Sequence, residues 1–293
     1  LLARFEEQNG IALEVRYGDS AELAATILEE GQNSPADVFI SQDAGSLGSV
    51  ADEGLFTEID QGILDRVDER FRSAEGLWVG VSGRARVAAY NTERLQEDDL
   101  PASIMDFTDP EWRGRIGFPP TNASFQAFVA AMLITEGEET TREWLEGIVA
   151  NEPRQYEGNS EVVQGIADGE IDVGFVNHYY KYELEAEEGS ELPVANHFFS
   201  GGDPGALVNV AGAATLATTD RPEEASRLID FLTGPEGQEY FATETWEYPV
   251  IDGVDPQAEL PSLEEIESPE LDLSDLGGTL EPALRLLADV GLV

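Results

Sequence analysis

The sequence predicts an α/β protein built from two lobes, and three observations support this fold class. Strand-like and helix-like segments alternate through the first half of the 293-residue chain, which favours a sheet covered by helices. Two unusually long apolar segments, 77–91 and 205–217, are suited to strands that pass from one lobe to the other. A hydrophobic content of 41% is enough for one large core or for two lobes of ordinary size.

The N-terminal quarter supplies the first alternating elements. In order, we expect a helix at 1–10, a strand at 11–18, a helix at 20–31, a strand at 36–41 and a helix at 45–54. Gly10 and Gly54 are placed to end the first and last of these helices, and Ser20 is placed to cap the second. This order predicts a mostly parallel, mixed sheet in each lobe, flanked by helices.

The alternation restarts after the first long segment. Here we expect a short helix and strand within 101–120, helices at 122–137, 140–151 and 159–169, a strand at 170–177, and two helices within 221–243 that are separated at Gly234-Pro235. The predicted lobe bounds are 1–86 and 214–262 for lobe 1, 87–213 for lobe 2, and 263–293 for a C-terminal helical tail. A binding cleft is expected between the lobes.

The charge balance is extreme and is distributed along the whole chain. Asp and Glu total 60 against 16 Lys and Arg, the formal net charge is −44, and Lys181 is the only lysine. Such a field repels nucleic acids and anionic lipids, so neither is an expected partner. Molar salt shortens the Debye length to about 3 Å and suppresses this self-repulsion. The composition therefore indicates a halophile, and we expect the fold to be lost when salt is removed.

Several classes of enzyme lack support in the sequence. There is no cysteine, which excludes disulfides and thiolate metal sites, and two histidines argue against a zinc enzyme. No Walker-type loop, G-x-S-x-G elbow or H-E-x-x-H motif is found. Pairs of carboxylates suited to glycoside hydrolysis arise by chance among so many acids and indicate nothing.

The chain begins inside a predicted helix, so we expect an N-terminal piece carrying any export signal or lipid anchor to be missing.

The most informative motif is Tyr179-Tyr180, at the junction of an apolar strand and a polar helix. Phenolate oxygen is a hard ligand suited to a highly charged cation. The alternative is a structural role, in which adjacent tyrosines in a strand face opposite sides, one the core and the other solvent. Asn177 and His178 add polar groups at the strand end, where ligands bind in α/β proteins. Because a phenol has a pKa near 10, only a strong Lewis acid displaces its proton at neutral pH. Ferric iron meets this requirement, while calcium and magnesium prefer carboxylates and water.

A second set of residues is suited to holding an anion. The N–H groups at the predicted helix start of residues 122–124 favour negative charge, and Asn159 begins another helix. Simple N-capping is the alternative explanation for either asparagine. Arg84 and Arg86 share one face of a strand, so one of them is expected beside an anion or a carboxylate, and an ordinary salt bridge is the alternative. Arg84 is our candidate.

Six motifs in the chain resemble the ferric-ion-binding family of extracellular solute-binding proteins that serve ABC importers. In family order these motifs are SPADVFISQDAGSL, GVSGRARVAAYN, PTNASFQAF, VNHYYKYEL, GDPGALVNVAGAA and FLTGPEGQEYFATETWEYPV. The resemblance covers nearly the whole chain, from about residue 1 to 250, and the composition suggests a haloarchaeal type. The resemblance implies the two-lobed, type II periplasmic-binding-protein fold, with capture by lobe closure.

The resemblance also implies a ligand set. The family binds iron with two consecutive tyrosines, here Tyr179 and Tyr180, and with a first-lobe carboxylate. This chain departs from the pattern there, because it has Gln42, followed by Asp43. The family's synergistic anion, such as phosphate or carbonate, would be held by residues at the positions of Asn122, Ala123, Ser124, Asn159 and Asn177.

The partner implied by the resemblance is an ABC permease. The protein is expected to be a monomer on the outer face of the cell membrane, anchored by lipid through the missing segment. Two alternatives remain at this stage: a binding protein for another small solute, such as an organic anion or a thiamine-like cation, and a carboxylate-based hydrolase. Visible colour with ferric citrate would separate an iron protein from both.

Overall fold

The computed structural model of the protein describes residues 1–257 and 260–293, which form two compact units. Unit 1 comprises Leu1–Gly83, Asn209–Ala258 and Asp272–Gly278, and unit 2 comprises Arg84–Val208, Glu259–Leu271 and Thr279–Val293. The chain changes unit within the long strand β3 (Val79–Asn91) and at the start of β8 (Val208–Leu216). Both long apolar segments are therefore strands that carry residues of two units. The changes fall a few residues before the expected lobe bounds at 86/87 and 213/214, which stay a prediction.

Unit 1 is a small antiparallel sheet with helices packed around it. Strands β1 (Val38–Ser41) and β2 (Phe56–Thr57) both pair with β8 in antiparallel register, so that Phe39 lies opposite Ala214. The helices of this unit are α1 (Leu2–Asn9), α2 (Ser20–Glu30), α3 (Ala44–Asp52), α4 (Gln61–Leu64), α9 (Pro222–Leu232) and α10 (Pro235–Glu244). The helix expected at the N-terminus is confirmed, and Gly10 ends it in the left-handed conformation at φ 65°.

Two details of the N-terminal prediction are wrong. Residues 11–18 form no strand, although their apolar residues alternate, and Val15 and Tyr17 are 44% and 85% exposed. A strand needs a neighbour to take its backbone hydrogen bonds, and none of the described strands pairs with this segment. The cap of α2 is Asp19 in place of Ser20, because the Asp19 carboxylate accepts the N–H groups of the first turn.

Unit 2 holds a mixed sheet. Strands β6 (Val173–Asn177) and β7 (Val194–His197) pair antiparallel with β3, while β4 (Ile116–Phe118) pairs parallel with β6 and with β5 (Arg154–Gln155). The mixed sheet was expected, but the expectation of mostly parallel neighbours fails at β3 and β8. These two strands carry the chain from one unit into the other, and each is antiparallel to the strands beside it within a unit.

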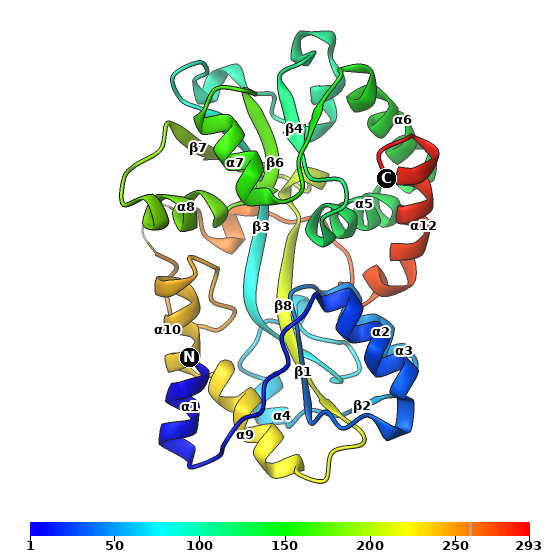
Figure 1. Ribbon diagram of the computed structural model, residues 1–293, viewed down its shortest axis with the longest axis vertical. Helices are drawn as coiled ribbons and strands as arrows, with labels where there is room; N and C mark the ends of the chain where they lie inside the picture. The colour runs from blue at the N-terminus through cyan, green and yellow to red at the C-terminus, as the bar shows by residue number, and fades with distance from the viewer. Residues whose placement is uncertain (258–259) are drawn as a thin grey trace. The chain divides into compact units, whose positions relative to one another are not determined.

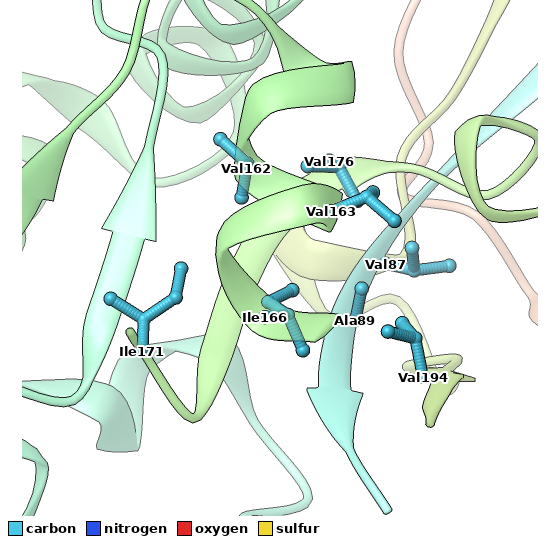
Figure 2. Close-up of a cluster of buried hydrophobic side chains, with 8 residues drawn as sticks. All are labelled: Val87, Ala89, Val162, Val163, Ile166, Ile171, Val176 and Val194. Atoms are coloured by element: carbon cyan, nitrogen blue, oxygen red, sulfur yellow. The ribbon is translucent and has the colours of Figure 1, made fainter. Parts of the chain in front are cut away.

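Helices cover the sheet of unit 2. They are α5 (Ala123–Thr135), α6 (Gly137–Ala150), α7 (Asn159–Ala167) and α8 (Tyr180–Glu188). Figure 1 shows α7 and α8 in green beside β6 and β7, and α7 packs on β6 and on α8. Figure 2 shows the buried cluster between α7 and the strands, formed by Val87, Ala89, Val162, Val163, Ile166, Ile171, Val176 and Val194. The ring of Tyr180 packs against this cluster, so the core supports the start of α8.

The C-terminal region packs into both units. It contains α11 (Leu263–Ile266) and α12 (Asp275–Asp289). In unit 1 a Cβ on Gly48 would lie 2.6 Å from the carbonyl oxygen of Ser274, so this close approach requires glycine. In unit 2 Arg142 forms an ion pair with Asp289 at 3.3 Å. Among the described residues, no helix combines the length and the apolar character needed to cross a membrane.

Candidate functional site

The tyrosine pair lies in unit 2, where β6 ends at Asn177 and α8 begins at Tyr180. Tyr179 has a helical backbone, with φ −77° and ψ −21°. Consecutive residues on a helix are about 100° apart and do not alternate between opposite faces. The two rings therefore lie together, with centroids 4.4 Å apart and planes inclined by 30°. The core-and-solvent alternative weighed for a strand does not apply to this backbone.

Residues around the pair hold it in place. His178 is buried, and its Nδ1 accepts the N–H of Ala85 at 3.2 Å. Asn196 Nδ2 donates to the carbonyl oxygen of His178 at 2.7 Å. The guanidinium carbon of Arg84 lies 5.5 Å from the centre of the Tyr179 ring, a cation–π arrangement. Arg84 is thus beside the tyrosine pair.

Lys181 follows the pair directly on α8. Its Nζ is 2.9 Å from Glu185 Oε2 and 4.5 Å from the centre of the Tyr182 ring. Its side chain is 17% exposed. The single lysine of the chain is therefore paired and partly covered.

A polar network surrounds the start of α5. The side-chain oxygen of Asn122 accepts the N–H of Ser124 at 3.0 Å and its hydroxyl at 2.6 Å, so Asn122 is the N-cap. Asn159 Nδ2 donates to Asn122 Oδ1 at 3.1 Å and to Ser124 Oγ at 3.2 Å. Gly158 is the N-cap of α7, and no side chain caps that helix. N-capping therefore describes Asn122, while the side chain of Asn159 is directed to the start of α5.

Arg86 completes this network, and sequence reasoning passed over it in favour of Arg84. It is 3% exposed and lies opposite Asn177 in the β3–β6 ladder. Its guanidinium donates to Ser124 Oγ at 3.3 Å, to Asn177 Oδ1 at 3.2 Å and to the carbonyl oxygen of Phe175 at 2.8 Å. All three acceptors are neutral. The available signal was a second arginine in a strand made mostly of apolar residues.

The charge of Arg86 persists in this setting. Burial lowers the pKa of its guanidinium from the ordinary value for arginine to about 10, and the neighbouring phenols of Tyr180 and Tyr179 oppose this shift. Arg86 is therefore a cation at neutral pH, although it is removed from water. A buried charge is costly unless an opposite charge or several hydrogen bonds compensate it. Here the hydrogen bonds come from uncharged groups, and the positive charge is available to a bound anion.

The two first-lobe candidates lie in unit 1. Asp43 is the N-cap of α3, and its carboxylate accepts the N–H of Ser46 at 2.7 Å and its hydroxyl at 2.9 Å. The backbone N–H of Gln42 donates to Ser20 Oγ at 3.0 Å. Asp43 thus has a structural role of its own. The described residues contain no group of three or more His, Cys, Asp or Glu side chains that could hold a metal.

Comparison with known proteins decides the family. A family model described as "Bacterial extracellular solute-binding protein" matches residues 33–272. The chain belongs to this family. Among its relatives is the "Fe(3+)-binding periplasmic protein" of Serratia marcescens, which is 33% identical over 99% of this chain and 85% of the relative.

Solved structures of other solute-binding proteins share the fold. Iron-bound HitA from Pseudomonas aeruginosa superposes with a TM-score of 0.93 at 38% identity, covering 99% of this chain and 94% of that one. A Trichodesmium protein, IdiA or FutA, in complex with iron and citrate gives a TM-score of 0.87 at 29% identity, with coverages of 99% and 94%. The periplasmic-binding-protein fold expected from the sequence is confirmed by these similarities.

Proposed function

We propose that this extracellular solute-binding protein captures ferric iron for an ABC importer, with Tyr179 and Tyr180 as ligands. The observation that carries the proposal is the placement of two phenols side by side, with centroids 4.4 Å apart, at the end of a buried strand. Relatives named or solved as iron-binding proteins support it. Phenolate oxygens bind a hard cation, and binding releases their protons.

We further propose that a synergistic anion accompanies the metal. The start of α5, the amides of Asn159 and Asn177 and the buried charge of Arg86 together form a setting that favours negative charge. An anion here would balance part of the charge of the metal. Phosphate or carbonate is our proposal for this chain, whereas the Trichodesmium structure contains citrate.

The remaining parts of the proposal rest on the family resemblance. A first-lobe ligand would come from Gln42 or Asp43, and capture would proceed by lobe closure. Delivery would be to a membrane permease, by a monomer acting at the outer face of the membrane. Lipid anchoring of the chain and the absence of nucleic-acid partners stay predictions.

The decisive experiment replaces each tyrosine by phenylalanine. Tyr179→Phe and Tyr180→Phe are expected to abolish or strongly shift the visible absorption of the ferric complex, because each change removes one oxygen ligand. Titration with ferric citrate in molar salt measures this, and a thermal melt checks the fold. The matched control is Tyr156→Phe, a tyrosine of the same unit whose hydroxyl bonds Glu170 at 3.3 Å.

A tyrosine with only a structural role gives a different result. It loses one hydrogen bond on becoming Phe, a net cost of about 0.5–1.5 kcal/mol that appears in the melt and spares the colour. Unchanged colour and affinity in both variants would end the ferric proposal. The buried cation Arg86 would then favour a binding protein for an organic anion.

A further inference from the structure

We propose that the anion bound at the start of α5 must itself donate a hydrogen bond, and that the side-chain oxygen of Asn159 accepts it. This inference rests on the proposed function, because it concerns the same anion site. In this proposal Asn159 makes the site selective for an oxyanion that carries a proton, such as hydrogenphosphate or hydrogencarbonate. Arg86 is a positioning residue that fixes the direction of the hydrogen bonds around it.

The orientation of the Asn159 amide follows from its neighbours. The N–H of Ser124 can only donate, so the Asn122 atom 3.0 Å away from it must be the oxygen. The Asn159 atom 3.1 Å from that oxygen must in turn be the amide nitrogen, since two oxygens would repel. The oxygen Oδ1 of Asn159 is therefore directed away from Asn122.

Arg86 fixes the rest of the network in the same way. A guanidinium only donates, so Ser124 Oγ and Asn177 Oδ1 both act as acceptors toward it. The hydroxyl hydrogen of Ser124 is then directed to Asn122 Oδ1, at 2.6 Å. Because the oxygen of Asn177 faces Arg86, its Nδ2 is the group that it can direct to a ligand. The nitrogen of Asn159 already donates to Asn122 and Ser124, so its oxygen is the group that remains for a ligand.

The oxygen of Asn159 is buried without a partner among the described residues. Its side chain belongs to a residue that is 2% exposed. An acceptor removed from water without a donor is unfavourable, and such groups in native proteins call for an explanation. A bound anion that carries an O–H group satisfies this oxygen, while its other oxygens accept from Asn177 and from the start of α5.

Sulfate and monofluorophosphate provide the comparison. At neutral pH hydrogenphosphate has an O–H group, whereas sulfate and monofluorophosphate are tetrahedral dianions without one. A buried site that hydrogen-bonds an O–H rejects the analogue that lacks it, because the acceptor is left unpaired. We expect phosphate to bind on the order of 100-fold more tightly than either analogue.

The first test uses the unmodified chain in chloride-based molar salt. Isothermal calorimetry measures the affinities of the metal-free protein for phosphate, sulfate and monofluorophosphate. A preference for phosphate of tenfold or more over both analogues supports the inference. A smaller preference over monofluorophosphate overturns it, and so does a failure of all three anions to bind.

A matched pair of variants assigns the effect to one residue. Asn159→Leu removes the acceptor and is expected to reduce the preference for phosphate below tenfold. Asn177→Leu removes a donor and is expected to weaken phosphate and sulfate equally, leaving the preference intact. Equal preferences in Asn159→Leu and the unmodified chain would overturn the assignment. Thermal melts check that both variants are folded, and the measurements on the unmodified chain do not depend on them.

Failure of the inference can be distinguished from failure of the proposed function. A ferric complex that is coloured, and that loses its colour in Tyr179→Phe, supports the iron proposal whichever anion is present. Equal support of that colour by phosphate, sulfate and monofluorophosphate overturns only the inference about Asn159. A colourless protein that prefers phosphate supports the inference and overturns the iron proposal.

Discussion

Two helix starts, one in each unit, are built alike and differ in charge. Helix α3 of unit 1 is capped by Asp43, and α5 of unit 2 is capped by Asn122. Each capping side chain accepts both the N–H and the hydroxyl of a nearby serine. The carboxylate of Asp43 supplies a negative charge to the positive end of its helix, whereas neutral Asn122 supplies none.

The difference marks the start of α5 as a place without negative charge in this acidic chain. Helix α5 has no acid in its first turn, and the buried cation Arg86 bonds to Ser124 within that turn. Unit 1 completes its helix start with its own carboxylate, whereas the helix start in unit 2 carries no acid, as the proposed anion site requires.

The largest effect is expected from removing salt, which tests whether the excess of acidic residues, against which the two helix starts are compared, destabilises the fold. With a net charge of −44, transfer from molar salt to dilute buffer is expected to unfold the protein, because repulsion among surface carboxylates is no longer screened. Far-ultraviolet circular dichroism across a salt series measures the transition. A spectrum that stays the same throughout the series would contradict the halophilic interpretation.

Arg86→Met is the next largest perturbation, because it removes the cation and its hydrogen bonds to three acceptors. We expect a loss of about 2–4 kcal/mol in the free energy of unfolding, together with loss of phosphate binding. The matched control is Arg94→Met, in which the side chain is 49% exposed and pairs with Asp172. An exposed pair contributes about 0.2–1 kcal/mol. Similar losses in the two variants, measured by urea unfolding in molar salt, would show that burial of Arg86 has no special role.

Asn122→Asp gives α5 the charged cap that α3 already has. Asp and Asn cap about equally well, so stability is expected to change by less than about 1 kcal/mol. Phosphate affinity is expected to fall at least tenfold, equivalent to about 1.4 kcal/mol, because the new carboxylate repels the anion. Asn122→Ser, with a neutral cap, is the control and is expected to retain more affinity. Calorimetry on both variants makes the comparison, and equal affinities would separate the cap from the anion site.

The smallest effect is expected from the reciprocal change, Asp43→Asn. The amide still caps α3 but no longer complements the helix dipole, a cost of about 0.3–1 kcal/mol in the free energy of unfolding. If Asp43 acts only as a cap, the visible spectrum of the ferric complex does not change. A shifted spectrum or weaker iron binding would instead make Asp43 a first-lobe ligand, as the family resemblance implies.

The elements that depend on local signals were predictable from the sequence. Periodicity and capping residues predicted the helices α1 and α5, and an unusually long, mostly apolar segment predicted β3. Segment 11–18 failed because a strand depends on a partner, and nothing in its own residues shows whether one is present.

The candidate site was predictable in its residue types and less so in its geometry. The strand-to-helix junction drew attention to Tyr179 and Tyr180, but their stacking depends on a backbone conformation that the dipeptide does not encode. The sequence does not separate Arg84 from Arg86, because both lie on one face of the strand and positive charge is scarce throughout the chain. Only the register that pairs Arg86 with Asn177 distinguishes them.

The single lysine has a practical consequence for studying this protein. Lys181 directly follows the two tyrosines, is partly covered, and is held by Glu185. An amine-reactive fluorophore that is kept from the α-amino group, for example by prior blocking at neutral pH, therefore has one side chain to modify, and that side chain lies at the first turn of α8. Because ferric phenolate complexes absorb visible light, a dye on Lys181 that emits in that band would be quenched by energy transfer. If the tyrosines bind iron as proposed, Lys181 provides an optical reporter of metal loading without any engineered residue.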